Sequence, residues 1–395
     1  MGQAATFLVI AIVWVLLHVY LVARMPRPTS AAGRIATRSA GLVLALLPII
    51  TMSLGRARAV GSVADTIQTV GFISLGFSSL AVTFVLVLDV VRGIGKLAMK
   101  ITRTRPAPSA VDAQRRDFLG RLVNVGAVAG ASGLTAIGYS LANRAPQLVE
   151  IDVPIVGLSD SLRGFRIVQL TDLHVGPTIK NKQLSVIVDM ANELQADVVA
   201  VTGDVVDGLA DLVAHELEPL GQLSSRHGTY YVTGNHEYYW GAQSWIDVMT
   251  RLGATALLDS HRVIQHGNAT LLVAGVTDYT SKRFVPEHVS DPERAAAGAP
   301  PCDFRLLLAH QPKSIHAAAR AGYDLQISGH THAGQYFPWN LVVPLVQPYV
   351  FGLHLHERTW IYVSRGTGYW GPPVRTPKPG ELTLLRLVRA ESDVT

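Results

Sequence analysis

The sequence predicts N-terminal transmembrane helices followed by an α/β domain, and two observations support this prediction. Hydrophobic residues make up 49% of the 395 residues and charged residues only 16%, whereas soluble domains usually contain about 25% charged residues. The charge is also unevenly distributed, because residues 1–143 contain 14 Lys and Arg but only four acidic residues. A chain of this length accommodates two or three domains.

Three apolar runs form a predicted membrane anchor over residues 1–105: Phe7–Ala23, Ala40–Leu54 and Val70–Val91. About 20 apolar residues are needed to cross a bilayer as a helix, and the first and third runs fit this length. The second is shorter and contains Pro48. We predict a span there too, with a buried helix of a soluble domain as the alternative. No ionisable residue is expected deep inside the three runs, which favours an anchor over a transporter.

The loops between these runs predict an orientation. Basic residues occupy the first loop (Arg24, Arg27, Arg34, Arg38), the second (Arg56, Arg58) and, most densely, the third (Arg92, Lys96, Lys100, Arg103, Arg105, Arg116). The positive-inside rule places the first and third loops in the cytoplasm and the N-terminus outside.

Residues 106–145 form a predicted linker with a fourth apolar segment. Arg115 and Arg116 are followed by Phe118-Leu119 and by the moderately apolar run Leu122–Leu141, a pattern that resembles a twin-arginine export signal. An ordinary basic flank is the alternative. Ser140-Leu-Ala142 has the small residues of a cleavage site. The export motif and the charges of the loops independently predict a multi-pass protein of the cell membrane with its C-terminal domain outside the cytoplasm.

Residues 146–395 alternate between short apolar runs and amphipathic segments, which predicts an α/β layered domain. The expected strands are Arg166–Leu170, Asp197–Val201, Thr229–Val232, Thr270–Ala274, Arg305–Leu308, Asp324–Ile327, Trp360–Val363 and Leu382–Leu387, and the expected helices are Lys182–Leu194, Asp211–Leu223, Gln243–Leu252 and Lys313–Ala321. The domain has neither a P-loop nor a dinucleotide-binding glycine pattern. The excess of basic over acidic residues belongs to the membrane flanks, so we expect no nucleic-acid partner.

Polar side chains follow five of the predicted strands. These side chains are Asp172, His174, Asp204, Asn235, His236, His310, His330 and His332. The carboxyl ends of parallel strands meet at one edge of a sheet, so these donors are expected to converge. A single cysteine, Cys302, excludes a thiolate cluster. Oxygen and imidazole donors together favour divalent Mn, Fe, Zn or Co over Mg or Ca alone.

The order of these motifs, D-x-H, G-D, G-N-H-E, H and G-H-x-H, resembles the calcineurin-like metallophosphoesterase superfamily. Ala333-Gly-Gln335 and Arg365-Gly-Thr-Gly368 are similar to its membrane-associated bacterial (YkuE/YaeI-like) branch. The resemblance implies a four-layer αββα sandwich and two divalent metal ions. It assigns one ion to Asp172, His174 and His332, the other to Asn235, His310 and His330, and a bridging position to Asp204. It also implies that His236 stabilises the developing charge and protonates the leaving alkoxide. Asp207 and Glu237 are candidates for orienting imidazole N–H groups, with solvated loop acids as the alternative.

The implied activity is hydrolysis of a phosphoester by metal-activated hydroxide, and a non-catalytic metal-binding sensor is the alternative. The sequence leaves the monoester, diester and pyrophosphate classes and the oligomeric state open. Tyr336–Leu353 contains three prolines and no charged residue. The prolines argue against a helix. This segment is interpreted either as a buried flap on the sheet or as an apolar lip that admits a lipid-linked substrate.

Overall fold

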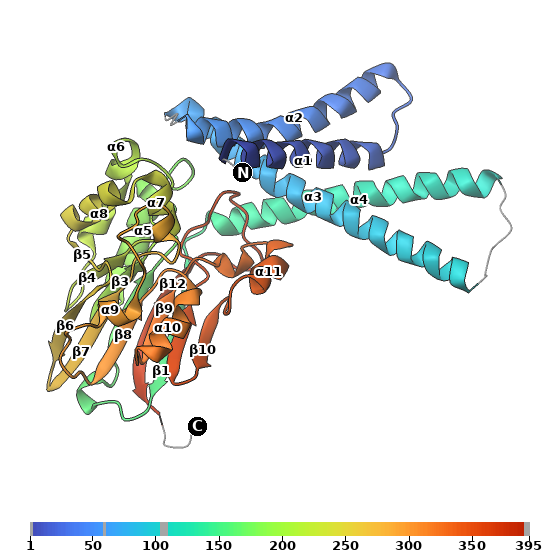
Figure 1. The fold of residues 1–395 in the computed structure, drawn as a ribbon. Helices are drawn as coiled ribbons and strands as arrows, with labels where there is room; N and C mark the ends of the chain where they lie inside the picture. The colour runs from blue at the N-terminus through green and yellow to red at the C-terminus, as the bar shows by residue number, and fades with distance from the viewer. Residues whose placement is uncertain (1–2, 58–60, 103–109, 391–395) are drawn as a thin grey trace. The chain divides into compact units, whose positions relative to one another are not determined.

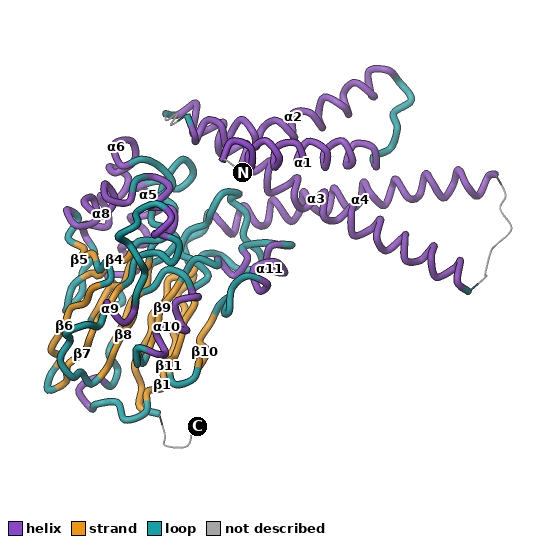
Figure 2. Tube along the Cα trace, in the orientation of Figure 1, coloured by secondary structure: helices purple, strands orange, loops and turns teal. Residues whose placement is uncertain are grey.

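A computed structural model describes residues 3–57, 61–102 and 110–390 (Figure 1). The chain clusters into two units, one comprising residues 1–140 with 371–374 and the other comprising residues 141–370 with 375–395. Helices make up the first unit, and both β-sheets belong to the second (Figure 2).

Four long helices dominate the first unit: α1 (Gln3–Arg24), α2 (Ala31–Arg56), α3 (Ser62–Ile101) and α4 (Ala110–Ala142). Helices α1, α2 and α3 pack against one another. Each of the four contains a stretch long and apolar enough to cross a membrane. Helix α2 continues through Pro48, so the short second apolar run is part of a 26-residue helix.

Asp89 is an acidic residue within the long apolar helix α3, and two arginines lie close enough to neutralise its charge. Its carboxylate lies 2.6 Å from Arg24 Nε of α1 and 3.2 Å from Arg92 Nη1. Arg92 also donates a hydrogen bond to Asn124 Oδ1 of α4 at 2.9 Å. This polar cluster joins α1, α3 and α4 near the predicted cytoplasmic loops. Arg103 and Arg105 of the third loop, and Arg58 of the second, lie outside the described residues.

His18 corrects one sequence prediction. It lies within the first apolar run, and only 2% of its surface is exposed. Its Nδ1 is hydrogen bonded to the Trp14 carbonyl at 2.9 Å, and its Nε2 has no partner among the described residues. The expectation that no ionisable side chain lies deep inside the three runs is therefore wrong. Imidazole is small enough to bond to its own helix, which explains how it is accommodated there.

Two six-stranded sheets form the second unit. The first has the order β1 (Gln147–Ile155), β12 (Glu381–Arg389), β2 (Arg166–Leu170), β3 (Val198–Thr202), β4 (Thr229–Val232) and β5 (Ala254–Ala256). The second has the order β10 (Gly352–His356), β11 (Thr359–Val363), β9 (Leu325–Ser328), β8 (Phe304–Leu308), β7 (Ala269–Gly275) and β6 (Ser260–His266). Strands β2 to β5 are parallel, as are β7, β8, β9 and β11.

The two sheets share one hydrophobic core, and each has a second core on its outer face. In β3, Val198 and Ala200 belong to the shared core, whereas Val199 and Val201 pack beneath α5 (Asn181–Glu193) and α8 (Ala242–Arg251). Helices α9 (Pro292–Ala295) and α10 (Ile315–Arg320) contribute to the core on the outer face of the second sheet. Central strands are thus buried on both faces, which explains their continuous apolar sequences.

Some elements differ from the prediction. The segment expected as the helix Asp211–Leu223 is one α-turn, α6 (Ala210–Val213), followed by a 3₁₀ segment, η2 (Ala214–Gln222), that contains Pro219. Strands β1, β5, β6 and β10 were not predicted. β5 has only three residues, and β6 and β10 are polar edge strands without a strong apolar run.

The segment Tyr336–Leu353 also departs from its prediction. It contains a short helix, α11 (Trp339–Val342), and a 3₁₀ turn, η6 (Val343–Leu345). Pro338 is the N-cap of α11 and Pro344 lies in the first turn of η6, positions where a missing N–H costs little. None of the residues of these two turns is buried. The interpretation as a buried flap is therefore wrong for these two turns, although Tyr336 and Gln347 of the same segment are buried.

Candidate metal centre

The candidate centre lies in the loops that follow β2, β3, β4, β8 and β9. Main-chain hydrogen bonds link these loops: Asp172 N donates to Gly203 O at 3.0 Å, and His174 N donates to Asp204 O at 3.1 Å. Across the second sheet, Gly329 N donates to His310 O at 3.0 Å. The loops are therefore rigid relative to one another, as a multi-ligand site requires.

Five of the candidate donors have an unusual backbone. Asp172, His174, Asp204, His330 and His332 all have φ between 49° and 70°, the left-handed region that costs a non-glycine residue about 1 kcal/mol or more. Such strain persists only where the surrounding structure enforces it, and it concentrates at functional sites.

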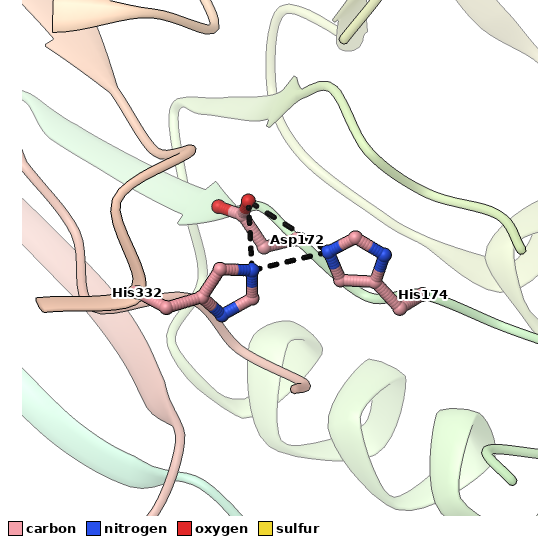
Figure 3. A group of neighbouring side chains, drawn as sticks. All are labelled: Asp172, His174 and His332. Carbon is pink, nitrogen blue, oxygen red and sulfur yellow. Dashed lines mark hydrogen bonds and ion pairs between the residues drawn. The ribbon is translucent and has the colours of Figure 1, made fainter. Parts of the chain in front are cut away.

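One group of donors comprises Asp172, His174 and His332 (Figure 3). His174 Nε2 lies 3.1 Å from His332 Nε2, and His332 Nε2 lies 3.4 Å from Asp172 Oδ1. The distance from His174 Nε2 to Asp172 Oδ1 is 4.0 Å. Ligands of one ion bound at about 2.1 Å lie about 3 to 3.5 Å apart in a tetrahedral arrangement. This group therefore fits a single cation with small adjustments.

A second group comprises Asp204, His310 and His330. His310 Nε2 lies 3.2 Å from Asp204 Oδ2, and His174 Nε2 of the first group lies 3.9 Å from the same oxygen. One carboxylate oxygen thus faces donors of both groups. An anion in this position reduces the repulsion between two cations about 3.5–4 Å apart.

Unpaired buried atoms support a cation at this point. Asn235 Oδ1 is buried without a hydrogen-bond partner among the described residues. His310 Nε2 is also buried, and its 3.2 Å contact with Asp204 Oδ2 does not have hydrogen-bond geometry. Burying polar atoms without partners is costly, and a divalent ion would coordinate both. Burial and the neighbouring His310 lower the pKa of His330 to about 3, and burial with His174 lowers the pKa of His332. Both imidazoles are therefore neutral at pH 7, the form that binds metal.

Asp207 contacts two imidazoles from one side. Its Oδ1 is hydrogen bonded to His236 Nδ1, and its Oδ2 lies 3.1 Å from His174 Nδ1. The Nε2 atoms of both histidines are then directed away from Asp207, and His236 Nε2 lies 3.9 Å from Asp204 Oδ2. Burial alone would lower the pKa of His236, but Asp204 and Asp207 raise it to about 9. The two carboxylates therefore favour the protonated form of His236.

Glu237 binds main-chain N–H groups and not an imidazole among the described residues, so the expectation that it orients an imidazole is wrong. Its carboxylate accepts N–H hydrogen bonds from Gly234 at 2.7 Å, Asp204 at 3.1 Å and Val205 at 2.7 Å. It is fully buried. These bonds join the loop after β3 to α7 (Asn235–Trp240), and so fix Asp204 relative to Asn235 and His236. Gly234 permits this approach, because a Cβ there would overlap Asp204.

The segment Arg365–Gly368 supports the first group. Thr367 N donates to Thr171 O at 2.8 Å, and Gly368 N donates to Asp172 O at 3.0 Å. A Cβ on Gly366 would lie 2.9 Å from His332 Nδ1. The glycines of this late motif are thus needed for close packing against Asp172 and His332.

All eight predicted site side chains lie in this one region, together with Asp207 and Glu237. Three further side chains of this region, those of Arg375, Tyr239 and Trp370, are not among the predicted site residues. The Arg375 guanidinium is buried 3.5 Å from His332 Nδ1, and no local pattern identifies it. The rings of Tyr239 and Trp370 lie 5.1 and 5.9 Å from that of His236. Of these three, only Tyr239 could be inferred from the sequence. It lies three residues after His236, and residues three apart on a helix are neighbours.

Comparisons with known proteins agree with this chemistry. The family profile of the calcineurin-like phosphoesterases matches residues 165–334. A zebrafish (Danio rerio) "transmembrane protein with metallophosphoesterase domain" is 35% identical over 334 residues, which cover 82% of this chain and 74% of that protein. An uncharacterized metallophosphoesterase of Helicobacter pylori J99 is 36% identical, covering 69% of this chain and 72% of its own length. The uncharacterized metallophosphoesterase YkuE of Bacillus subtilis is 27% identical, with coverages of 69% and 97%.

Proposed function

The chain belongs to the calcineurin-like metallophosphoesterase family, which confirms the resemblance seen in its motifs, and from this we propose that it is a membrane-tethered, extracytoplasmic phosphoesterase. Its catalytic domain is an αββα sandwich. Its substrate is an amphipathic, lipid-linked phosphoester of the cell envelope. The observation that carries the proposal is the convergence of two groups of Asp and His donors on the loops at the carboxyl ends of the strands.

Each donor has a proposed role. Asp172, His174 and His332 hold one ion, Asn235, His310 and His330 hold the other, and Asp204 contacts both. Two ions of the Mn, Fe, Zn or Co type would activate a water molecule and neutralise charge on the phosphoryl oxygens. Asp207 fixes the ring of His174 through its Nδ1, at 3.1 Å, so that Nε2 is presented as the ligand atom.

His236 is the proposed proton donor to the leaving group. Its Nδ1 is held by Asp207 and its Nε2 faces Asp204, so the ring cannot rotate without losing the first contact. Asp204 and Asp207 raise the pKa of the imidazole and so favour its protonated form. A departing alkoxide near Nε2 would accept this proton as its bond to phosphorus breaks.

The proposed orientation depends on charge and on the export motif. The first and third loops contain most of the basic residues of the N-terminal half, which favours the cytoplasmic side for both loops. Arg115 and Arg116 are exposed near the start of α4, where a receptor for twin-arginine signals would meet them. After α4, the chain continues outside the cytoplasm.

The proposed substrate class rests on exposed apolar side chains. In the segment after β9, Trp339 is 47% exposed, Leu341 60% and Leu345 81%. Beside His236, Tyr239 and Trp370 are each 55% exposed. Exposed tryptophans and aliphatic side chains of this density are typical of contact with lipid or with an apolar ligand. An acyl or prenyl chain would lie on them while its phosphate enters the site.

The test uses the tag-free full-length chain in detergent. We expect at least two divalent ions per chain by mass spectrometry, two of them at the candidate centre. We also expect Mn²⁺-dependent release of phosphate or alcohol from a panel of aryl phosphomonoesters, aryl diesters and lipid phosphates, with the lipid phosphates preferred. Two bound ions with no hydrolysis of any panel member would support the sensor alternative, and absence of metal would reject both.

A further inference from the structure

A second set of metal-type donors lies at the opposite end of the same strands. Asp197 immediately precedes β3, and His227 lies two residues before β4. His266 is the last residue of β6 in the other sheet. The candidate catalytic centre follows the carboxyl ends of β3 and β4. The second set of donors is therefore separated from it by the length of these strands, about 15 Å.

The three donor atoms are close together. His227 Nε2 lies 2.9 Å from His266 Nδ1, and His266 Nδ1 lies 3.9 Å from Asp197 Oδ1. All three atoms lie within 4.8 Å of one another. These separations approach those of ligands on one tetrahedral ion, about 3 to 3.5 Å. The side chains of Asp197 and His266 are each 15% exposed, so an ion could enter from solvent.

The main chain holds this arrangement. His227 N donates to Asp197 O at 2.8 Å, and Asp197 N donates to Arg166 O at 2.9 Å. Arg166 N donates to Asp197 Oδ2, also at 2.9 Å. The other carboxylate oxygen, Oδ1, is the one that faces His266. Phe165 packs beside both imidazoles, with ring centroids 6.1 Å from His227 and 5.0 Å from His266.

Electrostatics favour a neutral imidazole at His227. Burial and the adjacent His266 lower the pKa of His227. The competing cation is Arg226, whose Nη1 lies 3.5 Å from Asp197 Oδ1. Its side chain is 64% exposed, and an ion pair of this kind contributes little. Arg226 can therefore turn into solvent when a cation binds.

We propose that Asp197, His227 and His266 form a further metal site that binds Zn²⁺, with water as the fourth ligand. Two imidazoles and one carboxylate match the preferences of zinc. The ion would connect β6 of one sheet to the loops before β3 and β4 of the other. Its role is then structural, and the site is independent of the proposed catalytic function.

The test compares the tag-free full-length protein with His266→Asn and Asp197→Asn after equilibration with Zn²⁺ and removal of free metal. Asn at position 197 retains an oxygen that can accept the Arg166 hydrogen bond. We expect each variant to bind one Zn²⁺ fewer per chain than the wild type. Zn²⁺ added to metal-depleted protein should raise the Tm of the wild type about 5 °C more than that of either variant.

His356→Asn is the matched control. His316 Nδ1 and His356 Nε2 also lie close, at 3.2 Å, but no third His, Cys, Asp or Glu of the described chain completes a group there. This variant should bind as much Zn²⁺ as the wild type. Hydrolysis of an aryl phosphate should be the same in all four proteins. Equal zinc contents in the wild type, His266→Asn and Asp197→Asn would overturn the proposal, whatever the outcome for phosphoesterase activity.

Discussion

The side chain of Gln335 makes two hydrogen bonds to the main chain of Trp370: Nε2 donates to Trp370 O, and Oε1 accepts from Trp370 N, each at 3.0 Å. Gln335 follows the G-H-x-H motif closely. Trp370 in turn meets the ring of His236 edge-on at 5.9 Å. A glutamine near the metal donors thereby positions an exposed indole beside His236, the proposed proton donor.

The first prediction concerns this indole. Trp370→Ala should raise the KM for naphthyl phosphate about three- to tenfold, because aromatic pairs contribute about 0.5–1.5 kcal/mol beyond buried area. The KM for methyl phosphate should hardly change. Gln335→Ala should reproduce part of the effect with Trp370 still present. Steady-state kinetics on both substrates provide the measurement, and an equal rise for both would exclude a contact between Trp370 and the leaving group.

The second prediction concerns Asp204. Asp204→Asn removes the charge that faces both groups of donors but retains Oδ1, which accepts the His236 N–H at 2.8 Å. We expect loss of at least one ion per chain and a fall in kcat of several orders of magnitude, with the circular dichroism spectrum unchanged. Asp303→Asn, at an exposed carboxylate bonded to Thr270, is the control. Full metal content with near-normal turnover would exclude a bridging role.

The third prediction separates acid catalysis from charge stabilisation at His236. His236→Gln should keep the metal content and lower kcat about 10²- to 10⁴-fold for an alkyl phosphate. Nitrophenolate leaves without protonation, so the loss should be much smaller for nitrophenyl phosphate. A loss of equal size for the two leaving groups would remove the acid role.

The donors of the candidate centre can be predicted from the sequence because they directly follow strands that are easy to recognise. Strands such as β2 and β3 are buried on both faces and appear as apolar runs, so Asp172 and Asp204 are recognisable as residues that follow strands. Arg375 and Trp370 cannot be predicted in this way. They reach His332 and His236 through a loop from a distant part of the chain, and such an approach leaves no local pattern.

The apolar segment after β9 shows the same limit of pattern-based prediction. Its three prolines predict that it contains no helix. In the structure, however, Pro338 and Pro344 lie at the starts of helical turns, where proline is tolerated. The absence of charged residues from this segment is consistent both with a buried flap and with an exposed apolar lip. Burial depends on which other segments cover it, and composition alone does not contain that information.

The fourth prediction concerns the export motif. Replacing Arg115 and Arg116 by Lys preserves the charge, so the positive-inside bias is unchanged. If a twin-arginine receptor translocates the domain, the double variant should leave it in the cytoplasm. Protease added to intact spheroplasts should then digest the wild-type domain and spare the variant. Arg121→Lys, which retains a cation beside Asp117, is the control. Equal digestion of wild type and double variant would show that charge bias suffices.

The last prediction concerns the exposed apolar segment. Trp339 and Leu341 are 47% and 60% exposed, so replacing both by Ser should cost little stability. If they contact the acyl part of a lipid phosphoester, removing them forfeits on the order of 2 kcal/mol of apolar burial. The KM for a lipid phosphate presented in vesicles should therefore rise about tenfold or more. The kcat/KM for nitrophenyl phosphate should stay within about twofold.

Val156→Ser is the matched control for this variant, because Val156 is an apolar side chain that is 70% exposed in the turn after β1, away from the loops of the candidate centre. It should leave both kinetic constants unchanged. Vesicle co-sedimentation of each protein separates weaker substrate recognition from weaker membrane contact. If the double variant loses activity on the vesicle and soluble substrates alike while its Tm is unchanged, the segment supports the site itself, and the preference for lipid-linked substrates loses its basis.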